Sequence, residues 1–263
     1  MKNRNLLIMS VLIAFLIVIS CQKEPETGFT INANEAFTGD TLSFTNTTIS
    51  GDHYSWDFGD NQTSTDENPL HVYTKAGEYT VILKAFSKNG KKTGTSEQTL
   101  KIEKAYEITY DENKYPLSKA YLDIWGDYDG TYDYYHFNVA LVSDGITFTI
   151  DDVLGIGNII SASLWSPSAT SIVPGTYTFA DNYTAMSYNY GLIGLNYNVA
   201  NDIGTSFECT GGNVVVEQEG TDYIFDMSYT LATGKIVTAH FKGALIIYDH
   251  TGKSLNSPYG FRF

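Results

Sequence analysis

A closely spaced run of strand and turn signals near residue 60 places the strongest constraint on how this chain folds. It begins with a short aromatic segment, Tyr54 to Phe58, followed at once by the turn residues Gly59-Asp60-Asn61. A loop containing proline leads into Asn68 to Tyr73, and strict alternation of side chains then follows from Tyr79 to Leu83. Short alternating strands separated by Gly, Asp and Asn turns are typical of a small β-sandwich.

The block Trp56-Asp57-Phe58-Gly59-Asp60, with Ala76-Gly77-Glu78-Tyr79-Thr80-Val81 after it, resembles the polycystic kidney disease (PKD) domain, an immunoglobulin-like module. The resemblance implies a sandwich over residues 29–103 whose core is filled by the Trp56 ring. That family usually has Gly where this chain has Asn61, and Asn is the next best residue for a left-handed backbone. The module is a spacer or binding domain and not a catalyst, so function is expected in the rest of the chain.

The first 21 residues predict export from the cytoplasm. Lys2 and Arg4 provide a positive start, and Leu6 to Ile19 form an apolar segment too short for a comfortable membrane span. Val18-Ile19-Ser20-Cys21 resembles the lipobox cut by lipoprotein signal peptidase, which implies a lipid anchor on Cys21. The alternative is an ordinary secretory signal followed by a chance cysteine.

A polar, acidic linker is expected over residues 22–28. In this linker, Lys23 followed by the acidic Glu24 is similar to a surface-export signal of certain Gram-negative bacteria. We therefore expect a lipoprotein of the outer membrane that faces the cell exterior.

Composition excludes some partners. The formal charge is −14, and removal of Lys2 and Arg4 with the signal makes it −16. Nucleic acids and anionic lipids are bound by clustered basic residues, so no nucleic-acid partner is expected. Of the two cysteines, Cys209 is left without an intrachain partner, and its strand-like surroundings predict a buried core residue.

The second half of the chain also predicts only strands. A charged segment containing a proline, 104–118, is expected to be a hinge, and residues 119–263 then show strand patterns separated by Gly, Asp and Asn. No segment has a helical period. The predicted fold is therefore all-β: an N-terminal immunoglobulin-like PKD sandwich and a C-terminal antiparallel β-sandwich or small barrel.

A hairpin around Asp129-Gly130 is the predicted binding site. Asp-Gly favours a two-residue turn, which makes residues whose numbers sum to 259 face each other. The core face would then carry Leu122 and Ile124. The opposite face would carry rings and polar groups, with the pairs Trp125–Tyr134, Asp123–His136, Asp127–Tyr132 and Tyr121–Asn138.

Aromatic rings beside carboxylates, an imidazole and an amide suit sugar recognition, because rings stack on C–H faces while polar groups meet hydroxyls. The candidate ligand-binding residues are Trp125, Tyr134, Tyr132, Tyr121, Asp123, His136 and Asn138. The competing interpretation is that Trp125 and Tyr134 only pack across the strands, or are covered by another segment.

No catalytic motif is present, since the sequence has no serine elbow, zinc-ligand spacing or phosphate loop. We expect no catalytic residues, no metal site and no cofactor. Two functions remain open: a surface lipoprotein that binds glycans, and a structural or assembly component of a surface complex or adhesin that contacts other proteins.

The lipid anchor gives the first testable prediction. Cys21→Ala should abolish incorporation of a labelled fatty acid and leave an unanchored or unprocessed protein, because no other segment is expected to hold the chain on a membrane. The measurement is lipid labelling followed by membrane fractionation, and labelling that persists in the variant would contradict the lipobox interpretation.

Overall fold

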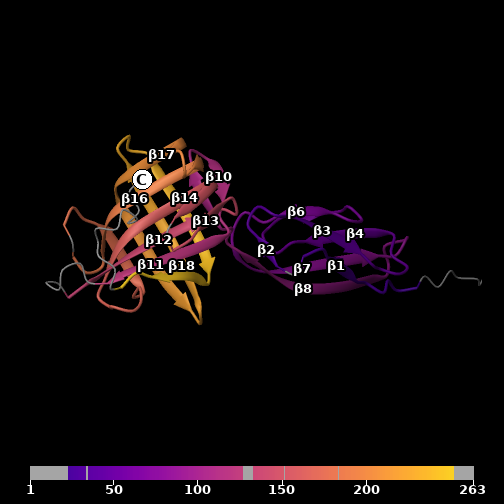
Figure 1. Ribbon diagram of the computed structural model, residues 1–263. Coiled ribbons are helices and arrows are strands. Elements are labelled where there is room, and N and C mark those ends of the chain that lie inside the picture. Colours follow the sequence, from indigo (N-terminus) through magenta and orange to yellow (C-terminus); the bar gives the residue numbers. More distant parts are fainter. Residues whose placement is uncertain (1–22, 34, 127–132, 151, 183, 252–263) are drawn as a thin grey trace, which may run out of the picture. The chain divides into compact units, whose positions relative to one another are not determined.

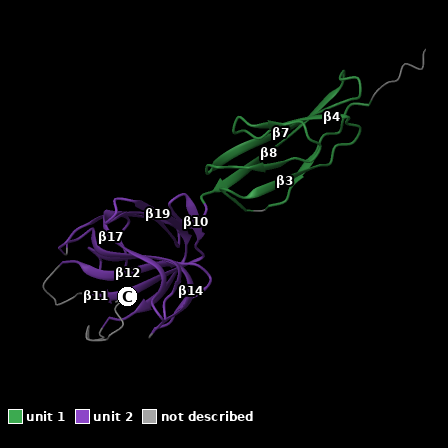
Figure 2. Cartoon of the chain, turned by 90° about the horizontal axis from the view of Figure 1, so that it is seen from above, with its two compact units in different colours: residues 1–104 green, residues 105–263 purple. Residues whose placement is uncertain are grey.

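Strands make up all the regular structure in the described part of this protein. The computed structural model describes residues 23–33, 35–126, 133–150, 152–182 and 184–251. No helix occurs in these segments, so none of them contains a helix long and apolar enough to cross a membrane. The chain divides into two compact units, Met1–Lys104 and Ala105–Phe263, shown in separate colours in Figure 2.

The first unit is a sandwich of two sheets. Its strands are β1 (Phe29–Ile31), β2 (Ala36–Phe37), β3 (Thr41–Asn46), β4 (His53–Asp57), β5 (Thr63–Ser64), β6 (Leu70–Val72), β7 (Gly77–Phe86) and β8 (Thr93–Glu103). One sheet has the order β1-β3-β6 and the other β2-β8-β7-β4-β5 (Figure 1). Every pairing is antiparallel except that of β2 with β8. The predicted immunoglobulin-like sandwich is confirmed.

The Trp56 side chain organises the core of this unit. It is fully buried, and its ring meets the edge of Phe29 at a centroid distance of 5.1 Å. Phe58 stacks parallel to it at 6.5 Å. The indole Nε1 donates a hydrogen bond to the carbonyl oxygen of Asp66 at 2.9 Å, so the one polar atom of the ring is satisfied inside the core. The expectation that this ring fills the space between the sheets is confirmed.

The turn after β4 needs special backbone conformations. Gly59 has a φ of 81°, and a Cβ atom there would lie 2.8 Å from the carbonyl oxygen of Thr80. Asn61 has a φ of 71°, in the left-handed region that its sequence position predicts. The linker expected over residues 22–28 contributes to the same unit, because Glu26 forms a β-bridge with Ile49.

The second unit is one large curled sheet with a short accessory strand. Its strands are β9 (Glu107–Tyr110), β10 (Asn113–Pro116), β11 (Lys119–Gly126), β12 (Tyr135–Val142), β13 (Ile146–Phe148), β14 (Val153–Ser166), β15 (Gly175–Phe179), β16 (Ser187–Asn198), β17 (Ile203–Glu219), β18 (Asp222–Leu231), β19 (Ile236–Gly243) and β20 (Leu245–Asp249). The order is β10-β9-β19-β18-β17-β15-β16-β14-β12-β11-β20, with β13 paired to β14 and β16 also paired to β17.

The segment 104–118 is not a hinge. It contains β9 and β10, and β9 pairs with β19 inside the sheet of the second unit. The alternation of polar and apolar residues in this segment is short, and the turn residues Asp111 and Glu112, which both have positive φ, interrupt it. Charged residues on an edge hairpin therefore resemble a linker in sequence while their backbone is fully paired.

Curling of the sheet encloses a single apolar core. Figure 2 shows the strands of this unit bending round on themselves, and β11 contacts β19 although they are far apart in the strand order. The core accordingly joins side chains from both halves of the sheet, such as Leu122 and Phe137 with Val237 and Phe241. Strands of the large sheet give one face to this core. On the other face of β11, β12 and β14, a smaller buried cluster includes Ile146 and Phe148 of β13.

Cys209 is a core residue, as predicted. It is 8% exposed and packs in the enclosed cluster, and burial raises the pKa of its thiol to about 11. A thiol with so high a pKa is protonated at neutral pH, so Cys209 is a poor nucleophile.

Removal of the central ring should unfold the first unit preferentially. Trp56→Ala should lower its free energy of unfolding by about 3 to 5 kcal/mol, because a large cavity replaces a fully buried side chain. Leu70→Ala, at a position that is 66% exposed, is the matched control and should change stability by less than about 0.5 kcal/mol. Denaturant unfolding measures both, and an unchanged midpoint for Trp56→Ala would place the ring outside the stabilising core.

Candidate functional site

The β11–β12 hairpin keeps the predicted faces but not the predicted partners. The numbers of paired residues sum to 261, so Asp123 faces Asn138 and Tyr121 faces Ala140. A bulge at Trp125 then brings Gly126 opposite His136, where the described pairing ends. The predicted pairs Asp123–His136 and Tyr121–Asn138 are therefore wrong.

The predicted faces survive this error in register for a simple geometric reason. A register shift of two residues changes every partner and leaves every side chain on its original face, because the side-chain period of a strand is two. Leu122, Ile124 and Phe137 accordingly lie in the enclosed core, as expected from the sequence. The Asp129-Gly130 turn, and Tyr132 with it, fall outside the described residues.

The opposite face of the hairpin is covered. Tyr121, Asp123, Trp125 and Asn138 are each less than 9% exposed. The Tyr121 ring packs between Phe148, at a centroid distance of 4.5 Å, and Tyr248, at 6.2 Å. These residues do not form an open platform for a ligand, because neighbouring segments of the chain occupy the space in front of them.

His250 covers the centre of this face. Its ring stacks on Trp125 at 4.3 Å, and its Nε2 lies 3.0 Å from a carboxylate oxygen of Asp123. Burial raises the pKa of Asp123, and the interaction with His250 opposes that rise. The backbone N–H of His250 also donates to the carbonyl of Ile124, so the end of β20 is held against β11.

A second aromatic stack covers the other end of this hairpin face. The His136 ring lies against Trp165 at a centroid distance of 4.6 Å, and Tyr134 meets the edge of the same indole at 5.7 Å. Burial lowers the pKa of His136 to about 4, so its imidazole is neutral at pH 7. Tyr134 and His136, predicted as ligand-binding residues, therefore pack on Trp165, which the sequence analysis did not place beside them.

The same outer face continues across the sheet towards an open pocket. Asn138 pairs with Ser163 of β14, and Ser163 pairs with Tyr190 of β16. The Ser163 hydroxyl donates to the Asn138 side-chain oxygen at 2.8 Å. The predicted residues and the pocket therefore share one face of one sheet, and the pocket lies over β16 and β17.

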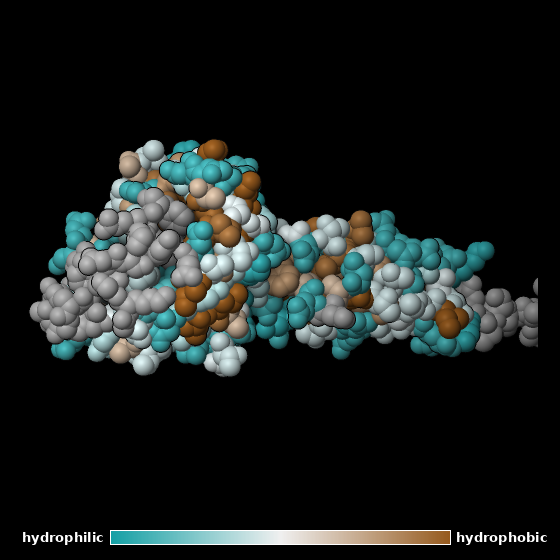
Figure 3. Space-filling view, viewed as in Figure 1, coloured by the Kyte–Doolittle hydropathy of each residue, from teal (hydrophilic) through white to brown (hydrophobic). Residues whose placement is uncertain are grey.

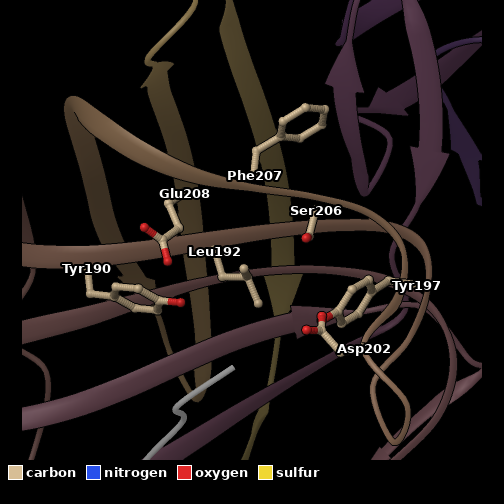
Figure 4. A pocket seen from close by; sticks show the side chains of 7 residues that line it. All are labelled: Tyr190, Leu192, Tyr197, Asp202, Ser206, Phe207 and Glu208. Carbon is tan, nitrogen blue, oxygen red and sulfur yellow. The ribbon is translucent and has the colours of Figure 1, made fainter.

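The pocket has a volume of about 220 Å³ and combines aromatic rings with oxygen groups. Figure 4 shows its lining side chains, which are Tyr190, Leu192, Tyr197, Asp202, Ser206, Phe207 and Glu208. They come from β16, from the turn that follows it and from the paired segment of β17. Pockets for drug-sized ligands span roughly 300 to 1,000 Å³, so this one suits a smaller group such as a single sugar ring.

Two glycines give the Tyr197 ring its position. A Cβ atom on Gly194 would lie 3.0 Å from the Cβ of Tyr197, and one on Gly204 would lie 2.9 Å from its Cα. The Tyr197 hydroxyl donates a short hydrogen bond to Asp202. Burial and the adjacent Asp202 carboxylate raise the pKa of Tyr197 to about 12. The phenol is therefore a fixed, neutral wall of the pocket.

Sequence analysis did not identify this site, because it singled out the hairpin around Asp129-Gly130 and named no functional residue in β16 or β17. The alternation of inward and outward side chains along β16 is interrupted, because its pairing with β14 shifts at a bulge near Ser163. The outward residues are Tyr190 and Leu192, and the inward residues are Tyr188 and Ile193. The density of Tyr, Leu and Ile between residues 188 and 197 was the available signal. No cluster of three or more potential metal ligands occurs in the described parts of the chain.

Comparison with known proteins concerns mainly the first unit. The PKD domain family model matches residues 23–102. These residues form a PKD domain. Collagenase ColQ1 of Bacillus cereus is 34% identical over 113 residues, which are 40% of this chain and 11% of that protein. The PKD1 domain of the Vibrio cholerae metalloprotease PrtV, a solved structure, is 33% identical and covers 31% of this chain and 99% of its own, with a TM-score of 0.27.

The chain thus spans about a tenth of the length of the collagenase it matches. A solved structure of carbohydrate-binding modules from the β-sandwich superfamily covers 84% of this chain and 91% of its own. It is 14% identical, with a TM-score of 0.33, and no conclusion about a ligand follows from it.

The buried imidazole predicts a pH dependence of stability. An unfolded histidine titrates near pH 6.5 and folded His136 near 4, so the unfolded chain binds more protons between these values. This contribution to stability is complete above pH 6.5 and is lost as the pH falls towards 4. His136→Phe keeps a flat ring against Trp165 and should reduce the drop in melting temperature between pH 7 and pH 5.

The matched control for this experiment is His53→Gln, because the His53 side chain is 62% exposed. It should retain the pH dependence of the unaltered protein. Equal drops in melting temperature for His136→Phe and the unaltered protein would show that His136 does not titrate with a lowered pKa.

Proposed function

We propose that the second unit binds carbohydrate in the pocket between β16 and β17, and that the protein is a non-enzymatic binding protein. The observation that carries the proposal is the composition of the pocket, in which Tyr190 and Tyr197 stand beside Asp202, Ser206 and Glu208. The partly exposed Tyr190 ring can stack on the C–H face of a sugar, with the buried Tyr197 ring behind the pocket wall. Carboxylates accept hydrogen bonds from the sugar hydroxyls, and the Ser206 hydroxyl accepts or donates them. The hairpin residues of β11 and β12 support this site from the same sheet and do not contact the ligand.

In this proposal the lipid on Cys21 holds the protein at the outer membrane, facing the cell exterior. The PKD domain is a spacer that carries the binding unit away from the anchor. The surface charge agrees with this location, since a strongly acidic chain does not bind anionic headgroups by charge.

The second candidate function is a structural or assembly role with a protein partner. It is favoured by β20, which is an edge strand among the described strands of its sheet. Ile246 and Ile247 on this strand are 42% and 55% exposed, and an apolar edge strand is a suitable surface for pairing with another chain. Figure 3 shows apolar side chains at the surface of this unit.

A glycan array probed with the purified protein tests the first function. Tyr190→Ala should weaken binding to any glycan that is found by about 1 to 3 kcal/mol, the cost of losing a central aromatic contact. Tyr115→Ala is the matched control, because Tyr115 is a half-buried tyrosine of β10 that does not line the pocket.

Melting curves of both variants show whether the fold survives. Lost affinity in Tyr190→Ala with retained melting would support the pocket. An array without a glycan hit would favour the assembly role, and equal affinity in both variants would move the glycan site away from β16.

A further inference from the structure

The charge of the pocket restricts its ligand further than its shape does. Asp202 and Glu208 are both exposed at the pocket and contribute two carboxylates. No lysine, arginine or histidine is among the side chains that line it. A ligand group placed between the rings therefore meets negative charge and no fixed positive charge.

Nothing else in the described part of the second unit compensates these carboxylates. That part contains four lysines and no arginine. Each lysine lies within ion-pair distance of another acid, in the pairs Lys114–Glu107, Lys119–Asp144, Lys235–Asp111 and Lys242–Glu219. The cations that the sequence provides here are thus engaged at other acids.

Tyr190 and Tyr197 do not alter the charge of the pocket. Burial raises the pKa of Tyr190, and the Glu208 carboxylate adds to the rise. Both phenols are therefore neutral at pH 7 and add no charge to the pocket. Tyr190 and Glu208 are diagonal neighbours on the same sheet face, because Glu208 pairs with Leu192, and Figure 4 shows them side by side.

We infer that the pocket, if it is the glycan site proposed above, recognises an amino sugar whose free ammonium group lies between the Tyr190 ring and the Glu208 carboxylate. An ammonium is attracted by the ring face and by the acid together. A neutral sugar retains only the stacking and hydrogen bonds, and an acidic sugar is repelled by Asp202 and Glu208. The inference names the substrate class of the site, and it rests on the proposed function.

Three hexasaccharides with the same β-1,4-linked backbone isolate the charge. They are cellohexaose, N-acetylglucosamine hexamer and fully de-N-acetylated glucosamine hexamer, which differ only in the group at carbon 2. Calorimetric titration of the full-length protein should give about fivefold tighter binding of the glucosamine hexamer than of cellohexaose at 50 mM NaCl. The difference should shrink at 500 mM NaCl, because salt screens exposed charges.

Glu208→Gln should remove this preference, since it keeps the side-chain size and deletes the charge. Glu217→Gln is the matched control, because Glu217 is exposed on the same strand and does not line the pocket. It should leave the preference intact.

Equal affinities for all three hexasaccharides, each abolished by Tyr190→Ala, would overturn the amino-sugar inference and leave carbohydrate binding in place. Absence of binding to the glucosamine hexamer would also overturn the inference. A preference for the glucosamine hexamer that survives Glu208→Gln would likewise contradict it, because the ammonium would then lie elsewhere. The glycan array decides the proposed function separately.

Discussion

The structure of the second unit depends on burying one face of a single curled sheet. Each strand gives alternate side chains to the enclosed core, so that Leu122, Phe137, Tyr188 and Phe225 are all less than 4% exposed. This arrangement stabilises the unit without a disulfide, since its described cysteine, Cys209, is free. It also restricts any recognition surface on this sheet to the outer face, because the inner face is filled by packed side chains.

The outer face is used in two different ways along the sheet. Over β11 and β12, rings from other segments pack onto it and hold a buried Asp123–His250 pair. Burial of these two polar groups costs hydration, and the hydrogen bond between them offsets that cost. Over β16 and β17, by contrast, the two glycines beside Tyr197 admit one ring and leave an open pocket. Packing therefore covers one end of this face, and the pocket lies at the other end.

In the proposed amino-sugar site, charge is the source of selectivity. The whole chain is acidic, but acidity in general does not choose a ligand, because solvent and salt screen exposed carboxylates. Glu208 differs from the other surface acids because it stands beside the Tyr190 ring in a concave site. The proposed preference for an amine follows from this juxtaposition, and the first unit contributes no residue to it.

The sequence by itself determined the local order of strands and turns. The Trp56 block specified its own sandwich, because a core indole, Gly59 at a close approach and Asn61 in a left-handed turn are requirements of single positions. It also determined which hairpin side chains face the core, since a period of two survives a register shift. Only the tertiary structure decided the partners of Asp123, the covering of Trp125 by His250 and the existence of the pocket. These features join residues up to 127 positions apart, and no local pattern encodes a contact made by the closing of a sheet.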